Sequence, residues 1–308
     1  MKRILVIAGG GKKHLKPFEE EGERLGLEVK IASFSDMHYG FDSLRSLTTR
    51  GSTAKLFVCE TPLSDFGLIY IRLVGRRYED LAILVNEAKK LKIPVVDRAF
   101  TESNLARLPI AKSLEIRLLA EAGLPVPKTI FDRLSYLFKK APEAFDYPFV
   151  LKSSTGKQGH GVWAPRNENE FAEIIEKLSK EEKEGKRFLA QEFVKAPKRV
   201  RVLVIGDRVI GAIQRPTKWR KRFSHEVIEK KALYPIPDKV RNLAVEAARA
   251  LMLDIAGVDI LIDPEPVSGS ARLYVLEVNS APLWEAIKRD CGVNVEAEIL
   301  KFLEKRIT

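Results

Sequence analysis

The chain has 308 residues, 45% of them hydrophobic and 31% charged, which excludes a disordered or fibrous protein and allows several packed units. The 53 lysine and arginine residues outnumber the 42 acidic ones and give a net charge of +11, which favours anionic partners: nucleotides, acidic metabolites, acidic peptide tails or nucleic acid. Most of this charge alternates with glutamate, as in EKLSKEEKEGKR, and is also explained by a solvated surface.

The number of cysteines and the lengths of the apolar runs indicate the cellular compartment of the protein. Cys59 and Cys291 are too few for a disulfide framework or a cysteine-rich metal site and favour a reducing compartment, so we expect a cytoplasmic protein. The N-terminal apolar run ILVIA is short and is followed by glycines. It predicts neither a signal peptide nor a membrane span.

The first hundred residues alternate between strand and helix patterns. We predict strands at 3–8, 28–32, 55–59, 67–73 and 93–97, and helices at 13–26 and 77–91. This alternation predicts a small parallel α/β unit.

A glycine-rich turn, AGGGKK at 8–13, follows the first strand. It fails the Walker pattern, because Val6 and Lys13 stand where glycine and serine or threonine are needed, and it fails the dinucleotide pattern at His14. A tight structural turn is favoured, with a smaller chance that the turn contacts substrate.

The pattern changes after residue 100. We predict helices at 101–107, 110–122, 167–185 and 238–251, strands at 147–152, 161–165 and 188–194, a hairpin at 199–214 turning at Gly206-Asp207, and two more strands. The hairpin-rich order is typical of antiparallel sheet.

Two constellations carry chemistry. In FVLKSSTGKQGHGVW (149–163) a strand ends at Lys152 and a glycine-bearing loop follows, so the backbone and Lys152 can fold over a polyphosphate; a flexible hairpin tip is the equal alternative. Further on, QEFV (191–194) ends a strand whose backbone can bond an adenine edge, with Glu192 as a polar anchor.

The other constellation is acidic. Glu277 and Asn279 share one face of a strand, and pairing with the 257–262 strand can bring Asp259 beside them. Two carboxylates and an amide oxygen suit Mg²⁺ held jointly with phosphates. An exposed face of an edge strand would explain these residues singly but not as an ordered set. The four dispersed histidines and the lack of a Gly-x-Ser-x-Gly elbow disfavour a histidine metal site and a hydrolytic triad.

Taken in order, Lys112, Lys152, the glycine loop, QEFV, GVD and EVNSAP resemble the ATP-grasp superfamily, and more narrowly the RimK-type carboxylate–amine ligases. The resemblance runs from about residue 100 to 306 and is strongest at 250–296. It implies an α/β pre-ATP-grasp domain at 1–99 and an α+β ATP-grasp fold of two subdomains clasping ATP. These are a central lid-bearing subdomain at 100–190 and a C-terminal subdomain with the metal site at 191–308.

The resemblance also implies roles for particular residues. Lys112 and Lys152 contact the phosphates of ATP, the 153–161 loop closes over them, and Arg201 and Arg72 face the transferred phosphate and the substrate carboxylate. The implied nucleotide-binding residues are Lys112, Lys152, Ser154, Gly156, Gln158, Gly159, Gly161, Gln191, Glu192, Phe193 and Val194. Asp259, Glu277 and Asn279 hold two Mg²⁺ ions, with Mn²⁺ as a substitute.

Two segments depart from the family pattern. Arg199 replaces the aspartate of the family's D-I-R element, and KWRKRFSHEVIEKK (218–231) replaces its R-S-N-x-x-x-G-G loop. Within the second segment Arg222 is assigned to catalysis, and the resemblance gives no family counterpart for Lys221 and His225.

The function expected is an ATP-dependent ligase that joins a carboxylate to an amine through an acyl phosphate, for example by adding glutamate or another amino acid to an acidic small molecule or protein tail. The partners are a small-molecule or peptide carboxylate and an amino-acid amine, with no membrane, no expected nucleic acid, and a dimeric or tetrameric assembly. Two rivals stay open: a kinase that phosphorylates a hydroxyl, and a basic, nucleotide-regulated binder of RNA or protein, suggested by Trp219 and Phe223 within the basic 215–231 segment.

Overall fold

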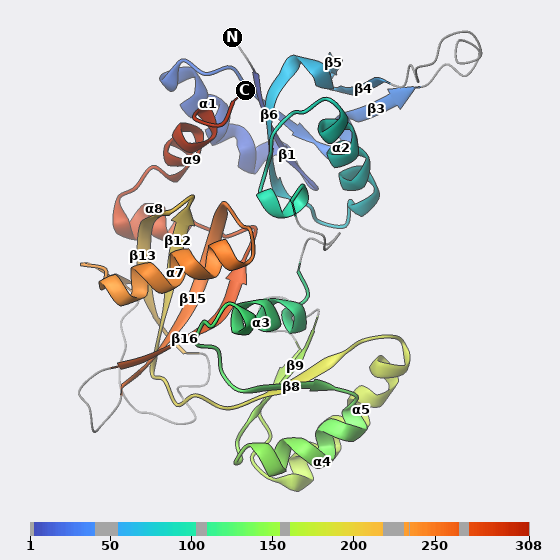
Figure 1. The fold of residues 1–308 in the computed structure, drawn as a ribbon, viewed down its shortest axis with the longest axis vertical. Coiled ribbons are helices and arrows are strands. Elements are labelled where there is room, and N and C mark those ends of the chain that lie inside the picture. Colours follow the sequence, from blue (N-terminus) through green and yellow to red (C-terminus); the bar gives the residue numbers. More distant parts are fainter. Residues whose placement is uncertain are drawn as a thin grey trace.

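The computed structural model describes residues 3–40, 55–102, 110–154, 161–217, 231–233, 235–264 and 271–307. Three units follow one another along the long axis of the molecule (Figure 1). The N-terminal unit lies at one end, the C-terminal unit in the middle and the central part of the chain at the other end. The expected α/β unit followed by an α+β fold is confirmed.

The N-terminal unit is built on a parallel sheet in the order β2-β1-β6-β7. Its elements are β1 (Arg3–Ala8), α1 (Lys16–Leu25), β2 (Val29–Ser33), β6 (Phe66–Leu73), α2 (Tyr78–Lys90) and β7 (Val95–Val96). The residues of β1 after its first are fully buried, as expected of a parallel strand covered on both faces. A small antiparallel sheet extends from it, made of β3 (Met37–Gly40), β4 (Lys55–Val58) and β5 (Thr61–Pro62).

The central unit is a four-stranded antiparallel sheet in the order β10-β9-β11-β8, covered by two helices (Figure 1). Its elements are β8 (Thr129–Asp132), α4 (Leu134–Ala144), β9 (Val150–Ser153), β10 (Val162–Trp163), α5 (Glu168–Lys183) and β11 (Phe188–Gln191). Leu137, Phe149, Phe171 and Phe188 are fully buried in its core. The residues of this core all come from the central unit itself.

The C-terminal unit is a five-stranded antiparallel sheet in the order β14-β13-β12-β15-β16. Its elements are β12 (Lys198–Ile205), β13 (Arg208–Pro216), β14 (Lys231–Ala232), α7 (Asp238–Ala250), β15 (Ile255–Pro264), β16 (Ala271–Asn279), α8 (Glu285–Cys291) and α9 (Val295–Glu304). The β12–β13 hairpin turns at Gly206, whose φ of 63° lies in the left-handed region that glycine favours, as predicted.

Alternate side chains of β12 point to opposite faces of the sheet, and the two faces have different surroundings. Val200, Val202 and Val204 pack in a core with α7, whereas Leu203 and Ile205 pack in another core on the opposite face. Arg199 and Arg201 lie on that opposite face further along the strand. The face is therefore apolar at one end and cationic at the other.

Helix α3 (Lys112–Glu121) precedes the central unit in sequence but packs on the C-terminal unit. Its Leu119 belongs to the core that contains α7, β12 and β15. The division of the chain at residues 100 and 191 remains a prediction, and the packing of α3 groups it with the later residues.

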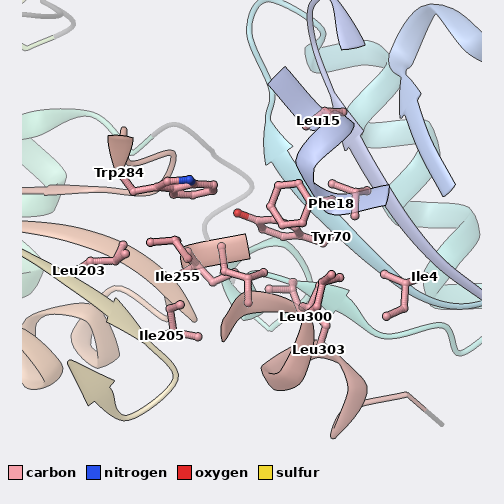
Figure 2. Close-up of a cluster of buried hydrophobic side chains, with 14 of the residues drawn as sticks. Ile4, Leu15, Phe18, Tyr70, Leu203, Ile205, Ile255, Trp284, Leu300 and Leu303 are labelled. Atoms are coloured by element: carbon pink, nitrogen blue, oxygen red, sulfur yellow. The ribbon is translucent and has the colours of Figure 1, made fainter. Parts of the chain in front are cut away.

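One core joins the N-terminal and C-terminal units (Figure 2). Ile4, Phe18 and Tyr70 pack in the same buried cluster as Trp284 and Leu300. Phe18 meets the rings of Tyr70 and Trp284 edge-on, at centroid distances of 6.0 and 6.2 Å. Helix α9 lies against α1, so the two ends of the described chain meet (Figure 1).

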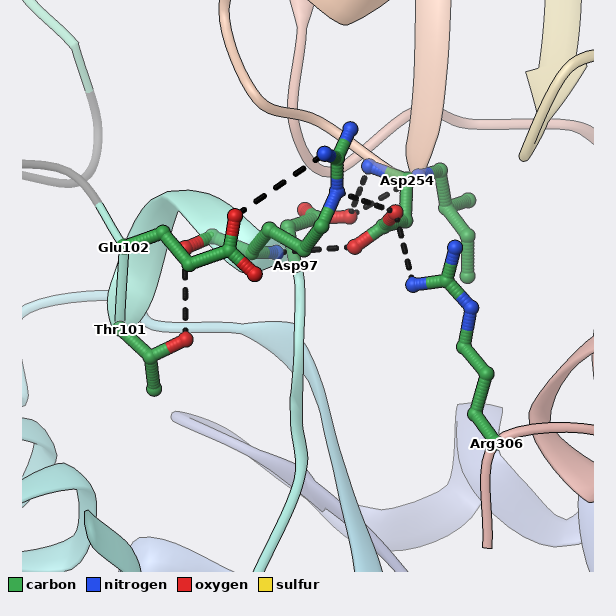
Figure 3. A network of polar contacts seen from close by, with 7 residues as sticks. Asp97, Thr101, Glu102, Asp254 and Arg306 are labelled. Carbon is green, nitrogen blue, oxygen red and sulfur yellow. Dashed lines mark hydrogen bonds and ion pairs between the residues drawn. The ribbon is translucent and has the colours of Figure 1, made fainter.

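A buried polar network strengthens this junction (Figure 3). Asp97 accepts hydrogen bonds from the backbone N–H groups of Asp254 and Ile255, both at 2.8 Å. The carboxylate of Asp254 in turn accepts hydrogen bonds from the guanidinium groups of Arg98 and Arg306, at 3.0 and 2.9 Å. Burial raises the pKa of Asp97 to about 8.

Several elements differ from the sequence prediction. Helix α4 was not predicted; Pro142 lies within it and interrupts the helical pattern. Strand β11 ends at Gln191 rather than 194, and helices α8 and α9 were also not predicted. Residues 103–107 of the expected 101–107 helix lie outside the described residues. In the part of the chain that the structure describes, no helix has the length and apolar character needed to cross a membrane.

Candidate functional site

A pocket opens between the central unit and the C-terminal unit. Its walls come from α3, from the central strands and from the cleft-facing side of the C-terminal sheet. The lining residues are Lys112, Glu115, Ile116, Pro127, Val150, Lys152, Val162, Gln191, Glu192, Phe193, Val194, Arg199, Thr217, Leu261, Leu276 and Glu277. Six of the residues predicted to bind nucleotide therefore meet in one place: Lys112, Lys152 and the four of QEFV.

The basic wall of the pocket holds two lysines. Lys152, half-buried at the end of β9, donates a hydrogen bond from Nζ to Oε1 of Gln191 at 2.5 Å. Burial, and then the charge of Lys112, lower the pKa of Lys152 to about 8. The charges of Glu277 and Glu115 act in the opposite direction, and a bound anion would likewise favour the charged form of this ammonium.

The start of the glycine loop is fixed to α3. The backbone N–H of Lys112 donates to the carbonyl of Ser154 at 3.1 Å, and the hydroxyls of Ser113 and Ser154 lie 3.2 Å apart. At the far side of the loop Gly161 has a φ of 74°, and a Cβ there would lie 3.0 Å from that of Ser153. The two described ends of the loop are thus tightly held. Gly156, Gln158 and Gly159 lie outside the described residues.

The acidic wall of the pocket comes from β15 and β16. Asp259 and Glu277 are register partners, as the sequence predicted, and Gly257 pairs with Asn279. A register shift between Asp259 and Ile260 leaves Leu276 as an extra residue on β16. This bulge lets both Leu276 and Glu277 line the pocket while Val275 and Val278 stay in the core.

Arg201 lies directly beside this acidic pair. Its Nε and Nη2 donate to the two carboxylate oxygens of Asp259 at 2.8 and 2.6 Å, and Asp259 is 1% exposed. The hydrogen bond from Arg201 holds the carboxylate in a fixed orientation. On the neighbouring row, Asn279 donates from Nδ2 to the carbonyl of Gly257 at 3.4 Å, which leaves its amide oxygen available.

Glu115 is a site residue that the sequence reasoning missed. It lies in the first turn of α3, is 5% exposed, and accepts a hydrogen bond from the backbone N–H of Val278 at 2.7 Å. Burial, with a smaller contribution from the charge of Glu277, raises its pKa to about 8. The available signal was an acidic residue on the apolar face of a helix, beside Ile116 and Leu119.

Two predicted residues have other contacts. Glu192 accepts from the backbone N–H of Lys128 through Oε1 at 2.9 Å, so its carboxylate already holds the strand end in place. Arg72 is not among the lining residues of the pocket. It donates to the carbonyl of Pro282 at 2.7 Å and stacks 4.0 Å above the ring of Trp284, at the junction of the N-terminal and C-terminal units. Arg222, like Lys221 and His225, lies outside the described residues.

The glycine-rich turn after β1 is a tight turn, as predicted. A Cβ on Gly9 would lie 1.9 Å from the carbonyl oxygen of Val74, so the turn needs glycine for close approach to the loop after β6. A cavity of about 390 Å³ lies beside it, lined by residues 9–12, Ser33, Ser35 and Arg77. Lys12 is paired with Asp36 at 3.0 Å in that region.

The predicted metal-binding residues are not a cluster of charged side chains. Within the described ranges no three His, Cys, Asp or Glu side chains are grouped to hold an ion. The predicted set differs from such a group, because it combines the Asp259–Glu277 pair with an amide oxygen and leaves positions for phosphate and water.

The same fold is found in a solved ATP-grasp ligase. Over 100% of this chain and 99% of the other, the structure is similar to that of PsnB, an ATP-grasp ligase, with a TM-score of 0.69 and 20% identity. PsnB was solved with a phosphomimetic variant of its minimal precursor, Mg and ADP, and also with the precursor peptide PsnA2 and AMPPNP.

Sequence comparison narrows the class to a family. A family model for the RimK-like ATP-grasp domain matches residues 110–303, and the chain belongs to that family. A probable alpha-L-glutamate ligase of Trichodesmium erythraeum is 35% identical over 94% of this chain and 91% of its own length. Another, of Mannheimia succiniciproducens, is 32% identical over 64% of this chain, and the match spans 64% of that relative.

Proposed function

We propose that this chain is an ATP-dependent ligase that joins a carboxylate to an amine. The observation that carries the proposal is one pocket with Lys112 and Lys152 on one wall and Glu277 on the other. Arg201 and Asp259 stand beside Glu277 in register. The names of the relatives, probable alpha-L-glutamate ligase, and the ADP, AMPPNP and Mg held by PsnB support it.

The chemistry explains why such a pocket needs cations. A carboxylate is a poor electrophile, because its leaving group would be oxide. Transfer of the γ-phosphoryl group of ATP gives an acyl phosphate, from which phosphate leaves when the amine attacks and forms the amide. Charge develops on the transferred group, and the fixed positive charges of Lys112, Lys152 and Arg201 stabilise it.

The residues present fit Mg²⁺. Glu277 and Asn279 offer oxygen donors, and an oxygen of Asp259 can bridge the Arg201 guanidinium and an ion because it has a second lone pair. When bound, Mg²⁺ would neutralise phosphate charge and orient the triphosphate. Two ions, and replacement by Mn²⁺, are part of the proposal.

The chain's own residues have defined tasks in this proposal. Lys152 holds its proton more tightly once a phosphate lies nearby and so stays charged. Leu261 and Leu276 give an apolar surface for the adenine, opposite the strand end at Gln191 to Val194. Ser154 and Gly161 anchor the loop whose closure would exclude water from the acyl phosphate.

The substrate class follows from the relatives. We propose that an amino acid such as glutamate supplies the amine, and that the carboxylate belongs to a small acid or a peptide. Assembly as a dimer or tetramer and a cytoplasmic location stay predictions. Light scattering of the purified chain and fractionation of its host test them.

The test is phosphate release from ATP, measured with acids and amines supplied separately and together. A ligase releases inorganic phosphate at its full rate only with both, and hydroxylamine in place of the amine gives a hydroxamate. Glu277→Gln should abolish release, and Glu173→Gln on exposed α5 serves as its matched control. If ATP is consumed and its phosphate stays on a hydroxyl product, the chain is a kinase instead.

A further inference from the structure

Arginines form a row on the face of the C-terminal sheet that lines the pocket. Arg199 and Arg201 are two residues apart on β12 and therefore point to the same side. Arg215, on β13, is the register partner of Arg199. Arg201 has Asp259 as its register partner, whereas Arg199 has Leu261.

Arg199 and Arg215 are the members of this row with unsatisfied donors. The buried Nε of Arg199 and the buried Nε of Arg215 have no hydrogen-bond partner among the described residues. Buried guanidinium nitrogens without acceptors cost free energy, and two like charges placed directly across a strand pair repel each other. Burial first, and then Arg201 and Arg199, lower the pKa of Arg215.

The neighbouring carboxylates do not account for this pair. Both oxygens of Asp259 accept hydrogen bonds from Arg201, whereas the nearest contact of Arg199 with Asp259 is 3.9 Å, from Nη1 to Oδ2. Glu277 lies on β16, three strands away from β13 in the sheet order. Asp259 and Asp290 raise the pKa of Arg215, but burial and the two neighbouring arginines outweigh them. The row therefore has a local excess of positive charge, with two buried Nε donors that have no acceptor in the described part of the chain.

We propose that Arg199 and Arg215 form an anion subsite that holds a second negatively charged group, a carboxylate or phosphate, of the acid substrate. The inference rests on the proposed ligase function and extends it to the substrate class. A guanidinium presents paired N–H groups that match the oxygens of such a group. A bound anion would satisfy both Nε atoms and relieve the repulsion between the two side chains.

The second negatively charged group would lie apart from the carboxylate that is activated. Arg215 lies two strands from Asp259 across the sheet, a separation of about 10 Å, and the Arg199 row is displaced along the strands by about 7 Å from the Arg201 row. Arg199 lines the pocket and Arg215 continues beyond it toward the outer strands. A ligand that touches both extends away from the nucleotide, as a substrate with two acidic groups does.

Binding of two tripeptides, measured by calorimetry with AMPPNP and Mg²⁺ saturating and 0.15 M salt, tests the subsite. The probes are Ala-Glu-Glu and Ala-Gln-Gln, which have nearly the same shape but differ in side-chain charge. We expect the wild-type chain to bind Ala-Glu-Glu at least tenfold tighter. Arg199→Gln and Arg215→Gln should each remove most of that preference, with less than a twofold change in ADP affinity.

Arg208→Gln is the matched control. Arg208 lies on β13, as Arg215 does, but it is exposed and paired with Glu298 at 3.0 Å. It should leave the preference intact, and unchanged melting temperatures would show that all three variants fold. Equal affinity of the wild-type chain for both tripeptides overturns the subsite. A loss of ADP affinity with an unchanged tripeptide preference would assign the arginines to the nucleotide and also overturns it.

These outcomes are separable from failure of the ligase proposal. If no acid and amine together release phosphate from ATP, the proposed function fails whatever the tripeptides do. If phosphate is released but the two variants keep the wild-type preference, the ligase stands and the subsite fails.

Discussion

The central unit and the other two units are held together in different ways. The N-terminal and C-terminal units share one buried core and the Asp97–Asp254 network, so they form a single packed block (Figures 2 and 3). The central unit has a core of its own, from Leu134 to Ala190, and meets the block around the pocket. The pocket therefore lies at a seam between the central unit and the block.

The largest effect, a loss of catalytic rate, is expected when a single charge is removed on either side of the seam. Glu277→Gln on the block and Lys152→Met on the central unit should each lower kcat by about 10³-fold or more, at least ~4 kcal/mol in the barrier. Steady-state phosphate release measures this. Melting temperatures close to the wild type are required, and full activity in either variant would contradict the shared site.

The next effect concerns the core that joins the block. Trp284 is 4% exposed and donates from Nε1 to Glu296 at 3.0 Å, so Trp284→Ala should cost about 3–5 kcal/mol of unfolding free energy. Hydrogen exchange should rise in both β1 and β12. Phe149→Ala in the central core is the matched comparison, and its increase should stay within residues 128–191. Equal spread of exchange in the two variants would mean that all three units unfold together.

A smaller effect is expected from pH at the junction. The pKa of Asp97 is raised to about 8, above its usual value, so the folded state binds more protons than the unfolded state between about pH 4 and pH 8. Stability should therefore fall as pH rises through this window, by up to about 1.4 kcal/mol per pH unit.

The variant Asp97→Asn keeps an oxygen for the two backbone N–H groups and removes the titration. Denaturant unfolding at pH 5, 6, 7 and 8 should show a flatter profile than the wild type. Parallel profiles would show that Asp97 is already ionised in the folded chain at pH 5.

The smallest effect is confined to the central unit. Asn167 caps α5 by accepting from the backbone N–H of Glu170 at 3.0 Å, so Asn167→Ala should cost about 1 kcal/mol. Proteolysis should become faster within α5 and not in α7. A loss that spreads to the block would weaken the distinction between the two regions.

Sequence reasoning succeeded where local pattern carries the structure. The period of β12, the glycine turn at 206 and the pairing of Asp259 with Glu277 follow from alternation and turn chemistry, which act over a few residues. It failed where distant contacts decide. Glu115 belongs to the site because its carboxylate accepts a hydrogen bond from the backbone of Val278, which is far away in sequence. The bulge at Leu276 is defined by its pairing with the neighbouring strand β15.

Distant residues also surround Arg72 and stabilise helix α4. The role of Arg72 at the substrate stays a prediction, and its contacts in the structure are with Pro282 and Trp284, about two hundred residues further along the chain. Helix α4 contains Pro142, a residue that is unfavourable inside a helix, and burial of Leu134, Leu137 and Ala141 outweighs that local preference.

The contact of α9 with α1 has a consequence for biosynthesis. Ile4 and Phe18 are translated well before Leu300 and Leu303, which belong to the same buried cluster. The N-terminal sheet must therefore wait with an uncovered apolar flank, and it should be a target for chaperones until α9 has been made.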